Sequence, residues 1–180
     1  LLSHVNMRPD KYIRDIVKDS RGHIWSGGYY NLKCFNLETN SARLYPGLNS
    51  ITSIVEKDKD NMWIGTANGL YLLNRNTGEY QYIEMEIGAI YINTLYQADN
   101  GLLYIGTNGG VFIYNSQDKI FEHYFSDNSA LVSNRIFTIL PEVDGRIMMS
   151  TENGITCFHT KEKVFRNWTR GEGLLPAYFN

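Results

Sequence analysis

The sequence predicts an all-β protein of four β-propeller blades, each a four-stranded antiparallel sheet, and three observations lead to this class. The first is a pattern of polar turn, apolar pair, large residue and small residue that recurs at a spacing near forty residues. Its large residue is Trp25, Trp63, Tyr104 or Met148, so the steps are 38, 41 and 44 residues. A repeat of this length, filled with short strand patterns, is typical of propeller blades.

The second observation is that other positions align with the large residue in all four copies. The first strand carries an aliphatic pair twelve and nine residues before it: Ile13 and Ile16, Ile51 and Ile54, Ile92 and Leu95, Ile136 and Ile139. A small residue follows two places after it: Gly27, Gly65, Gly106 or Ser150. A strand glycine commonly marks the close approach of another segment, so we expect it to make room for the aromatic side chain of the adjacent blade.

The third observation is the turn chemistry that divides each copy into four strands rich in β-branched and aromatic residues. In the second copy these strands span residues 51–55, 62–65, 70–73 and 79–83. Asn68-Gly69 lies between the second and third of them, and Asn-Gly pairs supply the positive φ that a tight hairpin needs. The predicted blades cover approximately residues 10–46, 49–83, 90–125 and 133–168.

We expect residues 1–180 to form one propeller segment. Residues 173–180 are similar to the lead-in of a first strand, which predicts the start of a further blade there. Propellers have four to eight blades, so four is the lower limit, and an open arc of four would expose two apolar blade faces. The sequence favours part of a larger ring of about seven blades, with the remainder of the propeller or a second copy of the chain covering the ends. Closure of four blades on themselves is the alternative.

Composition narrows the partners. The net charge is −2 and the pI is about 6.1, which argues against a nucleic-acid partner because phosphate binding requires a basic face. No run of eighteen or more apolar residues is present, so no membrane span is expected. Cys34 and Cys157 occupy the same position of separate repeats, beyond the ~7 Å Cα limit for a disulfide, so both are predicted to be free thiols.

Two of the copies resemble a known repeat. Residues 61–70 read Asn-Met-Trp-Ile-Gly-Thr-Ala-Asn-Gly-Leu, and residues 104–111 read Tyr-Ile-Gly-Thr-Asn-Gly-Gly-Val. Both resemble the regulator-propeller repeat of bacterial hybrid two-component sensors. The first copy departs at residues 26–31 and the fourth at residues 148–150. The resemblance extends over essentially the whole chain.

The resemblance implies the periplasmic sensory segment of a Bacteroidetes hybrid two-component sensor histidine kinase, an inner-membrane protein. Such sensors respond to oligosaccharides, so the segment is expected to bind one or to relay its signal. The kinase parts would lie outside this chain. A propeller lyase or hydrolase, and a non-catalytic scaffold for protein partners, are the alternative functions.

The chain carries no residue pattern typical of catalysis. Its four histidines, at positions 4, 23, 123 and 159, have no metal-ligand spacing, and no Cys-x-x-Cys motif occurs. Nucleophile elbows and phosphate-binding glycine loops are missing as well. We therefore expect no catalytic residue, no metal and no cofactor, and we predict that the chain is not an enzyme.

Recognition residues are expected on loops that share one face of a propeller: the turns between second and third strands, and the connectors between blades. Sugars are bound by aromatic faces together with amide and charged groups. The candidate ligand-binding residues are Tyr29, Tyr30, Asn31, Asn68, Tyr91, Asn108, Arg135 and Asn153, and the same loops also carry Asn49, Ser50, Asn93 and Asn134. For the Tyr29-Tyr30 pair, packing against the neighbouring blade is the alternative to binding. For the asparagines, the alternative is a purely turn-forming role.

Overall fold

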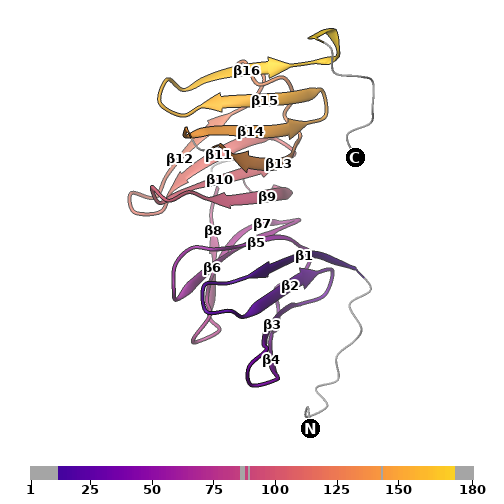
Figure 1. Ribbon diagram of the computed structural model, residues 1–180, viewed down its shortest axis with the longest axis vertical. Helices are drawn as coiled ribbons and strands as arrows, with labels where there is room; N and C mark the ends of the chain where they lie inside the picture. The colour runs from indigo at the N-terminus through magenta and orange to yellow at the C-terminus, as the bar shows by residue number, and fades with distance from the viewer. Residues whose placement is uncertain (1–11, 86–87, 89, 143, 173–180) are drawn as a thin grey trace. The chain divides into compact units, whose positions relative to one another are not determined.

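The computed structural model describes residues 12–85, 88, 90–142 and 144–172. The chain divides into two compact units, residues 1–89 (unit 1) and residues 90–180 (unit 2). Each described unit contains two four-stranded antiparallel sheets, as Figure 1 shows. The predicted fold class, all-β with four-stranded propeller blades, is therefore confirmed. The predicted start of a further blade at residues 173–180 lies outside the described residues.

Unit 1 contains the first two sheets, in which consecutive strands pair in chain order. The first sheet consists of β1 (Ile13–Lys18), β2 (Ile24–Gly28), β3 (Leu32–Asn36) and β4 (Ser41–Tyr45). The second consists of β5 (Ile51–Glu56), β6 (Asn61–Thr66), β7 (Gly69–Asn74) and β8 (Tyr80–Ile83).

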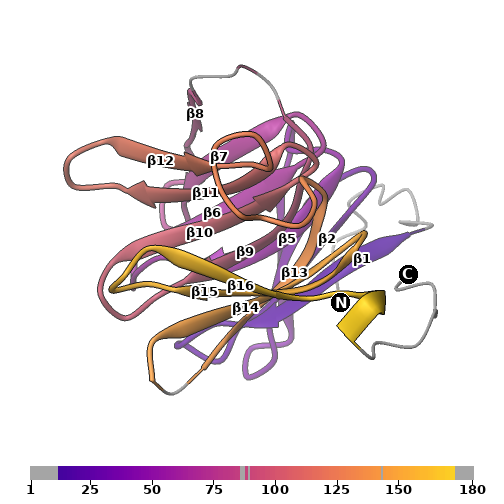
Figure 2. The ribbon, with the colours of Figure 1, turned by 90° about the horizontal axis from the view of Figure 1, so that it is seen from above.

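Unit 2 repeats this arrangement and ends in a short 3-10 helix, η1 (Arg170–Glu172). Its first sheet consists of β9 (Ile92–Gln97), β10 (Leu102–Thr107), β11 (Gly110–Asn115) and β12 (Ile120–Tyr124). Its second consists of β13 (Ile136–Pro141), β14 (Arg146–Thr151), β15 (Gly154–His159) and β16 (Val164–Trp168). In Figure 2 the two sheets of this unit overlap, and β13 packs against both β9 and β10.

The turns between second and third strands are built alike in three sheets. A threonine hydroxyl at the end of the second strand donates to the carbonyl of a glycine three residues later: Thr66 to Gly69 (2.9 Å), Thr107 to Gly110 (2.7 Å) and Thr151 to Gly154 (2.9 Å). Each of these glycines has a positive φ, which only glycine adopts freely. In the first sheet Gly28 occupies the threonine position, and Tyr29 and Tyr30 follow it. The loop that departs from the repeat therefore also lacks its hydroxyl bridge.

A joint between neighbouring sheets occurs within each unit, and the small residue of the second strand lies at its centre. A Cβ added to Gly27 would lie 2.4 Å from Cγ2 of Ile51, and one added to Gly106 would lie 2.8 Å from Cγ2 of Ile136. The expectation that these glycines make room for an aromatic side chain was wrong. They make room for the first-strand isoleucine of the next blade, because that side chain points directly at the glycine backbone.

The joint of unit 1 is closed at its edge by buried charges. Asp19 accepts hydrogen bonds from Trp25 Nε1 (2.8 Å) and from Arg75 (2.7 Å), and Arg75 also binds Glu56 Oε1 (2.7 Å). The side chains of Asp19 and Arg75 are almost completely buried. Asp19 belongs to the first sheet, whereas Arg75 and Glu56 belong to the second, so the network ties the two sheets together.

The joint of unit 2 is closed at the same edge by aromatic rings. Tyr124 lies 5.4 Å from Phe158 and 5.3 Å from Phe165, and Phe158 lies 4.7 Å from Phe165, measured between ring centroids. Tyr124 belongs to the first sheet of the unit and both phenylalanines to the second. Phe158 is buried within the apolar cluster that fills this joint.

Cys34 and Cys157 are both buried free thiols on third strands, as predicted. Burial, together with the nearby charge of Asp19, raises the pKa of Cys34 to about 11. Among the described residues, no helix has the length and apolar character required to cross a membrane.

Candidate functional site

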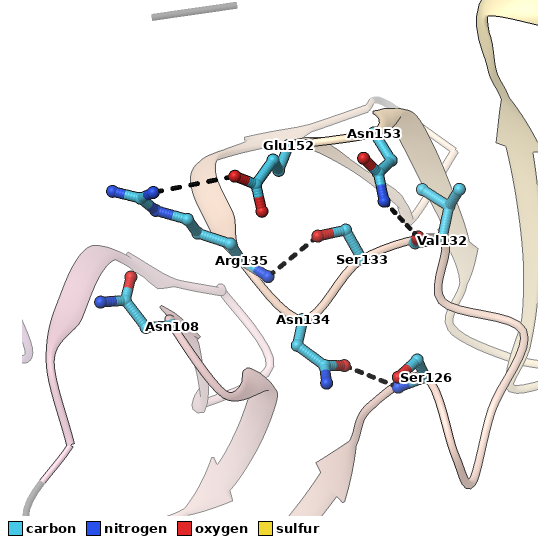
Figure 3. A pocket seen from close by; sticks show the side chains of 8 residues that line it. All are labelled: Asn108, Ser126, Val132, Ser133, Asn134, Arg135, Glu152 and Asn153. Carbon is cyan, nitrogen blue, oxygen red and sulfur yellow. Dashed lines mark hydrogen bonds and ion pairs between the residues drawn. The ribbon is translucent and has the colours of Figure 1, made fainter.

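Loops at one end of unit 2 enclose an open pocket of about 580 Å³ (Figure 3). They are the β10–β11 turn, the connector between β12 and β13, and the β14–β15 turn. The lining residues are Asn108, Ser126, Val132, Ser133, Asn134, Arg135, Glu152 and Asn153. Seven of these eight side chains are polar, so the pocket offers hydrogen bonds rather than an apolar surface.

The connector, residues 125–135, forms one wall and is held to both sheets. Gly110 N–H in the β10–β11 turn donates to Asn134 O (2.6 Å), and Asn153 Nδ2 in the β14–β15 turn contacts Val132 O at 3.4 Å. Within the connector, the Asn134 side chain accepts a hydrogen bond from Ser126 N–H (2.7 Å), as Figure 3 shows. These bonds hold the pocket loops in place without a ligand.

His123 supports the β10–β11 turn from below. Its ring stacks on Phe112 with centroids 3.8 Å apart, and its Nε2 lies 2.8 Å from Gly109 O. The adjacent Asn108 projects into the pocket, and its Oδ1 accepts a hydrogen bond from Asn93 Nδ2 (2.8 Å). The orientation of the Asn108 amide is thereby fixed, with its own Nδ2 directed away from that bond.

Arg135 and Glu152 give the pocket its charge. Their side chains are 3.9 Å apart and both are more than half exposed, so they form a loose pair that is available to a third group. The guanidinium supplies only donors and the carboxylate only acceptors. Because one positive and one negative charge face the same space, the pair suits a neutral ligand that both donates and accepts, such as a sugar with adjacent hydroxyls.

Three of the predicted ligand-binding residues meet in this pocket: Asn108, Arg135 and Asn153. Asn134, on one of the expected loops, joins them. Tyr91 lies in the same unit outside the lining, where its carbonyl accepts a hydrogen bond from Asn108 N–H (3.2 Å).

Sequence reasoning missed the pocket residues Ser126, Val132, Ser133 and Glu152. One signal pointed to the first three: residues 125–135 form a longer connector than residues 46–50 at the same place in unit 1. Extra length in a loop of a repeat protein commonly carries function.

The other four predicted residues, Tyr29, Tyr30, Asn31 and Asn68, belong to unit 1. Tyr29 and Tyr30 contact each other edge to face at 4.8 Å, and they are 53% and 37% exposed. The alternative that this pair is packed away against the neighbouring blade is therefore not what the structure shows. Asn68 is exposed, and its N–H donates to Thr66 Oγ1 (3.1 Å), as a turn-forming residue does.

Metal-ligating side chains are dispersed. Within the described ranges, no three His, Cys, Asp or Glu residues are grouped as a metal site requires. The Asn167-Trp168-Thr169 segment matches a glycosylation sequence, but its amide is engaged: Asn167 Nδ2 donates to Ala130 O (2.6 Å), and Oδ1 accepts from Thr156 Oγ1 (2.8 Å).

Solved structures with the same fold include bacterial sensor domains. The extracellular domain of the putative hybrid two-component system BT4673 from Bacteroides thetaiotaomicron is 23% identical with a TM-score of 0.77, over 89% of this chain and 22% of that one. The corresponding domain of BT3049 from the same organism is 22% identical with a TM-score of 0.76, over 92% and 23%. The chain thus spans about a fifth of the length of these domains.

Enzymes share the fold as well. A catalytically inactive virginiamycin B lyase from Staphylococcus aureus with quinupristin is 12% identical with a TM-score of 0.74, over 94% of this chain and 58% of the lyase. No curated protein matches the chain.

The family comparison identifies the repeat itself. Residues 8–30 and 46–68 match the family described as two component regulator propeller. These segments include Trp25 and Trp63 with the glycines that follow them, which are the positions that build the blades. The chain is a regulator-propeller region, an all-β segment made of two component regulator propeller repeats.

Proposed function

We propose that this chain is a periplasmic sensory segment of a hybrid two-component system, and that its unit 2 pocket binds a neutral, hydroxyl-rich ligand such as an oligosaccharide. The observation that carries the proposal is the convergence of three loops on one pocket with amides, hydroxyls and a loose Arg135–Glu152 pair. The fold shared with extracellular domains of Bacteroides sensors supports the sensory role. The histidine kinase that would receive the signal lies outside the chain.

Calorimetric titration with neutral hexaoses of the xylo-, manno-, malto- and cello- series tests the proposal. We expect at least one to bind, and Arg135→Ala to weaken it by about 10- to 100-fold, since a hydrogen bond to a charged group contributes about 1.5–3 kcal/mol. Lys161→Ala is the control, because this exposed cation lies in the β15–β16 turn, outside the pocket lining. Equal affinity of Arg135→Ala and the unaltered chain would refute the pocket assignment.

A second binding surface is carried by the exposed tyrosine pair of unit 1. Aromatic rings stack on the C–H faces of sugars, and Tyr29 and Tyr30 are the exposed aromatic pair on the loops predicted to bind. The double variant Tyr29→Ala plus Tyr30→Ala separates the two surfaces in the same titration. Loss of binding in this variant, with Arg135→Ala unaffected, would move the ligand site to unit 1.

Signal relay requires that the ligand prefer one arrangement of the sensor over another, because a ligand of equal affinity for both shifts nothing. We propose that binding changes the placement of propellers across a dimer, which the kinase reads. Equal affinity of the hexaose for both dimer arrangements would contradict this step. Turnover of a streptogramin B antibiotic by the purified chain would instead support the lyase alternative suggested by the shared fold.

A further inference from the structure

The face of β1 exposes two large aliphatic side chains. Ile13 and Ile16 are 59% and 67% exposed, although they lie in a β-strand and occupy the repeat positions of the aliphatic pair. Scattered apolar residues on a surface are ordinary, but adjacent ones on one strand face commonly mark an interaction site. We refer to Ile13 and Ile16 as the β1 face.

The same pair is buried wherever a sheet precedes it within a unit. In unit 1, Ile51 is fully buried and Ile54 is 3% exposed; in unit 2, Ile136 is fully buried and Ile139 is 8% exposed. Strand, register and residue type are the same in all three cases, and only the covering sheet differs. The exposure of the β1 face therefore reflects the lack of a described neighbour rather than a surface role of the residues.

The two joints also specify what covers such a pair. In both, the second strand of the preceding sheet contacts the first-strand isoleucine through a glycine that follows an aromatic residue by two positions. Gly27 follows Trp25 in one joint, and Gly106 follows Tyr104 in the other. Any Cβ at these glycines would overlap the isoleucine, so the fit is specific to a second strand of this type.

We propose that the β1 face is a docking surface for the second strand of a further blade of the same repeat, carried by the same polypeptide. That strand would present an aromatic residue and, two residues later, glycine against Ile13. Both joints described here join sheets that are consecutive in sequence, which favours a blade in the same polypeptide over a second copy. The sensor domains that share this fold are also four to five times longer than the matched stretch, so they have length for further blades.

A fusion that supplies the missing neighbour tests the proposal. A second copy of residues 90–135 is joined directly to Ile13, so that Ile13 follows Arg135 as Ile136 does in the chain. This added copy carries Tyr104 and Gly106 and the natural connector. We expect the melting temperature of unit 1 to rise by about 5 °C and amide exchange in β1 to slow by about tenfold or more.

Substitutions in the fusion separate docking from general stabilisation. Ile16→Asp is expected to abolish both gains in the fusion while changing the unfused chain little. Ile120→Asp in the original unit 2 is the matched control, because Ile120 is 59% exposed and lies on β12, away from the β1 face. It should leave the gains intact.

Three results would overturn the proposal. The first is unchanged exchange in β1 of the fusion. The second is an added copy that is cleaved by protease while the rest of the fusion resists. The third is sedimentation of the unfused chain as a dimer that Ile16→Asp dissociates, since this would assign the β1 face to a second copy instead.

Discussion

The two joints of this molecule share one backbone arrangement but are closed by different chemistry. In unit 1 a buried network of Asp19, Glu56 and Arg75 closes the edge of the joint. In unit 2 the corresponding edge is closed by Tyr124 and Phe158 within an apolar cluster. The comparison shows that the repeat fixes the approach of the sheets through its isoleucine and glycine, and leaves the edge free to vary.

The difference is complete at the level of register. Relative to the large residues, Asp19 corresponds to Ala98, Glu56 to Pro141, and Arg75 to Thr160. All three charged positions of unit 1 are thus uncharged in unit 2. A buried charge without its partner is strongly destabilising, so a partial exchange would leave one unpaired. The set is therefore expected to be exchanged as a whole.

The largest effect is expected from Arg75→Ala. It leaves the buried carboxylate of Asp19 without its cation, and breaking a buried pair in this way costs about 3–5 kcal/mol of the free energy of unfolding. Urea denaturation followed by tryptophan fluorescence measures it through Trp25. Arg21→Ala is the control, since its exposed pair with Asp60 should contribute no more than about 1 kcal/mol. Equal effects would mean that the network is not buried in solution.

In unit 2 the corresponding break is Phe158→Ala. Removing this buried ring from the aromatic cluster is expected to destabilise the unit by about 3–5 kcal/mol, through lost burial and the cavity that remains. Because no ions are involved, the loss should be the same at low and high salt. A loss that changes with salt concentration would contradict the apolar description of this joint.

The shared centre of the joints is tested by Gly27→Ala and Gly106→Ala. Each added methyl would overlap the isoleucine of the next sheet, and overpacking of this kind costs about 1–3 kcal/mol. Similar losses in the two variants would support a common centre with different edges. Gly101→Ala is a useful contrast: a Cβ there would meet no atom within 4 Å, although the positive φ adds some backbone strain.

Asp15 adds a pH dependence of opposite sign to that of Asp19. Burial raises the pKa of Asp15, despite a hydrogen bond from Ile54 N–H (2.6 Å) that opposes the shift. Its contribution to stability is therefore greatest below 3.8 and is lost as the pH rises through the folded-state pKa. Burial also favours a raised pKa for Asp19, but hydrogen bonds from Trp25 and His23 and the charge of Arg75 lower it overall. The contribution of Asp19 is present above 3.8 and is lost on acidification through its folded-state pKa.

Two substitutions isolate the role of Asp15. Asp15→Asn keeps an acceptor for Ile54 N–H and removes the titration, so its stability should exceed that of the unaltered chain increasingly as the pH rises above 3.8. Asp15→Ala leaves the N–H unpaired and should cost about 1–3 kcal/mol at neutral pH. Thermal unfolding at a series of pH values measures both, and a parallel pH profile for Asp15→Asn would count against the assignment.

The smallest effect is expected from Lys163→Ala. Lys163 binds Glu122 at 2.8 Å across the joint of unit 2, and this contact lowers the pKa of Glu122. Both side chains are well exposed, so the pair should contribute no more than about 1 kcal/mol and should weaken with salt. A cost comparable with that of Arg75→Ala would erase the contrast between the two joints.

The sheets could be predicted from the sequence because their determinants repeat. The large residue, the aliphatic pair and the turn glycines recur in several copies, so each copy supports the reading of the others. The buried network could not be predicted in this way. Asp19 looks like the other turn acids, such as Asp58, but it lies six residues before the large residue instead of five. Its partner Arg75 is 56 residues away in the sequence, and no other copy repeats it.

The pocket was partly foreseen for the same reason. Asn108 and Asn153 occupy turns whose place in the repeat is known, and Arg135 lies just before a first strand, so their loops could be assigned to a common face. Glu152 and the serines of the connector follow no repeated pattern. Their convergence depends on the path of residues 125–135, which is set by individual hydrogen bonds such as that from Gly110 to Asn134.

That connector has a mechanical consequence. Because it is bonded to the β10–β11 turn through Asn134 and to the β14–β15 turn through Val132, it acts as a strap over the top of unit 2. A molecule seated beneath it would load both sheets together, much as a wedge tightens a clamp. Occupancy of one small cavity could then be felt as added stiffness throughout ninety residues, without any strand changing its partner.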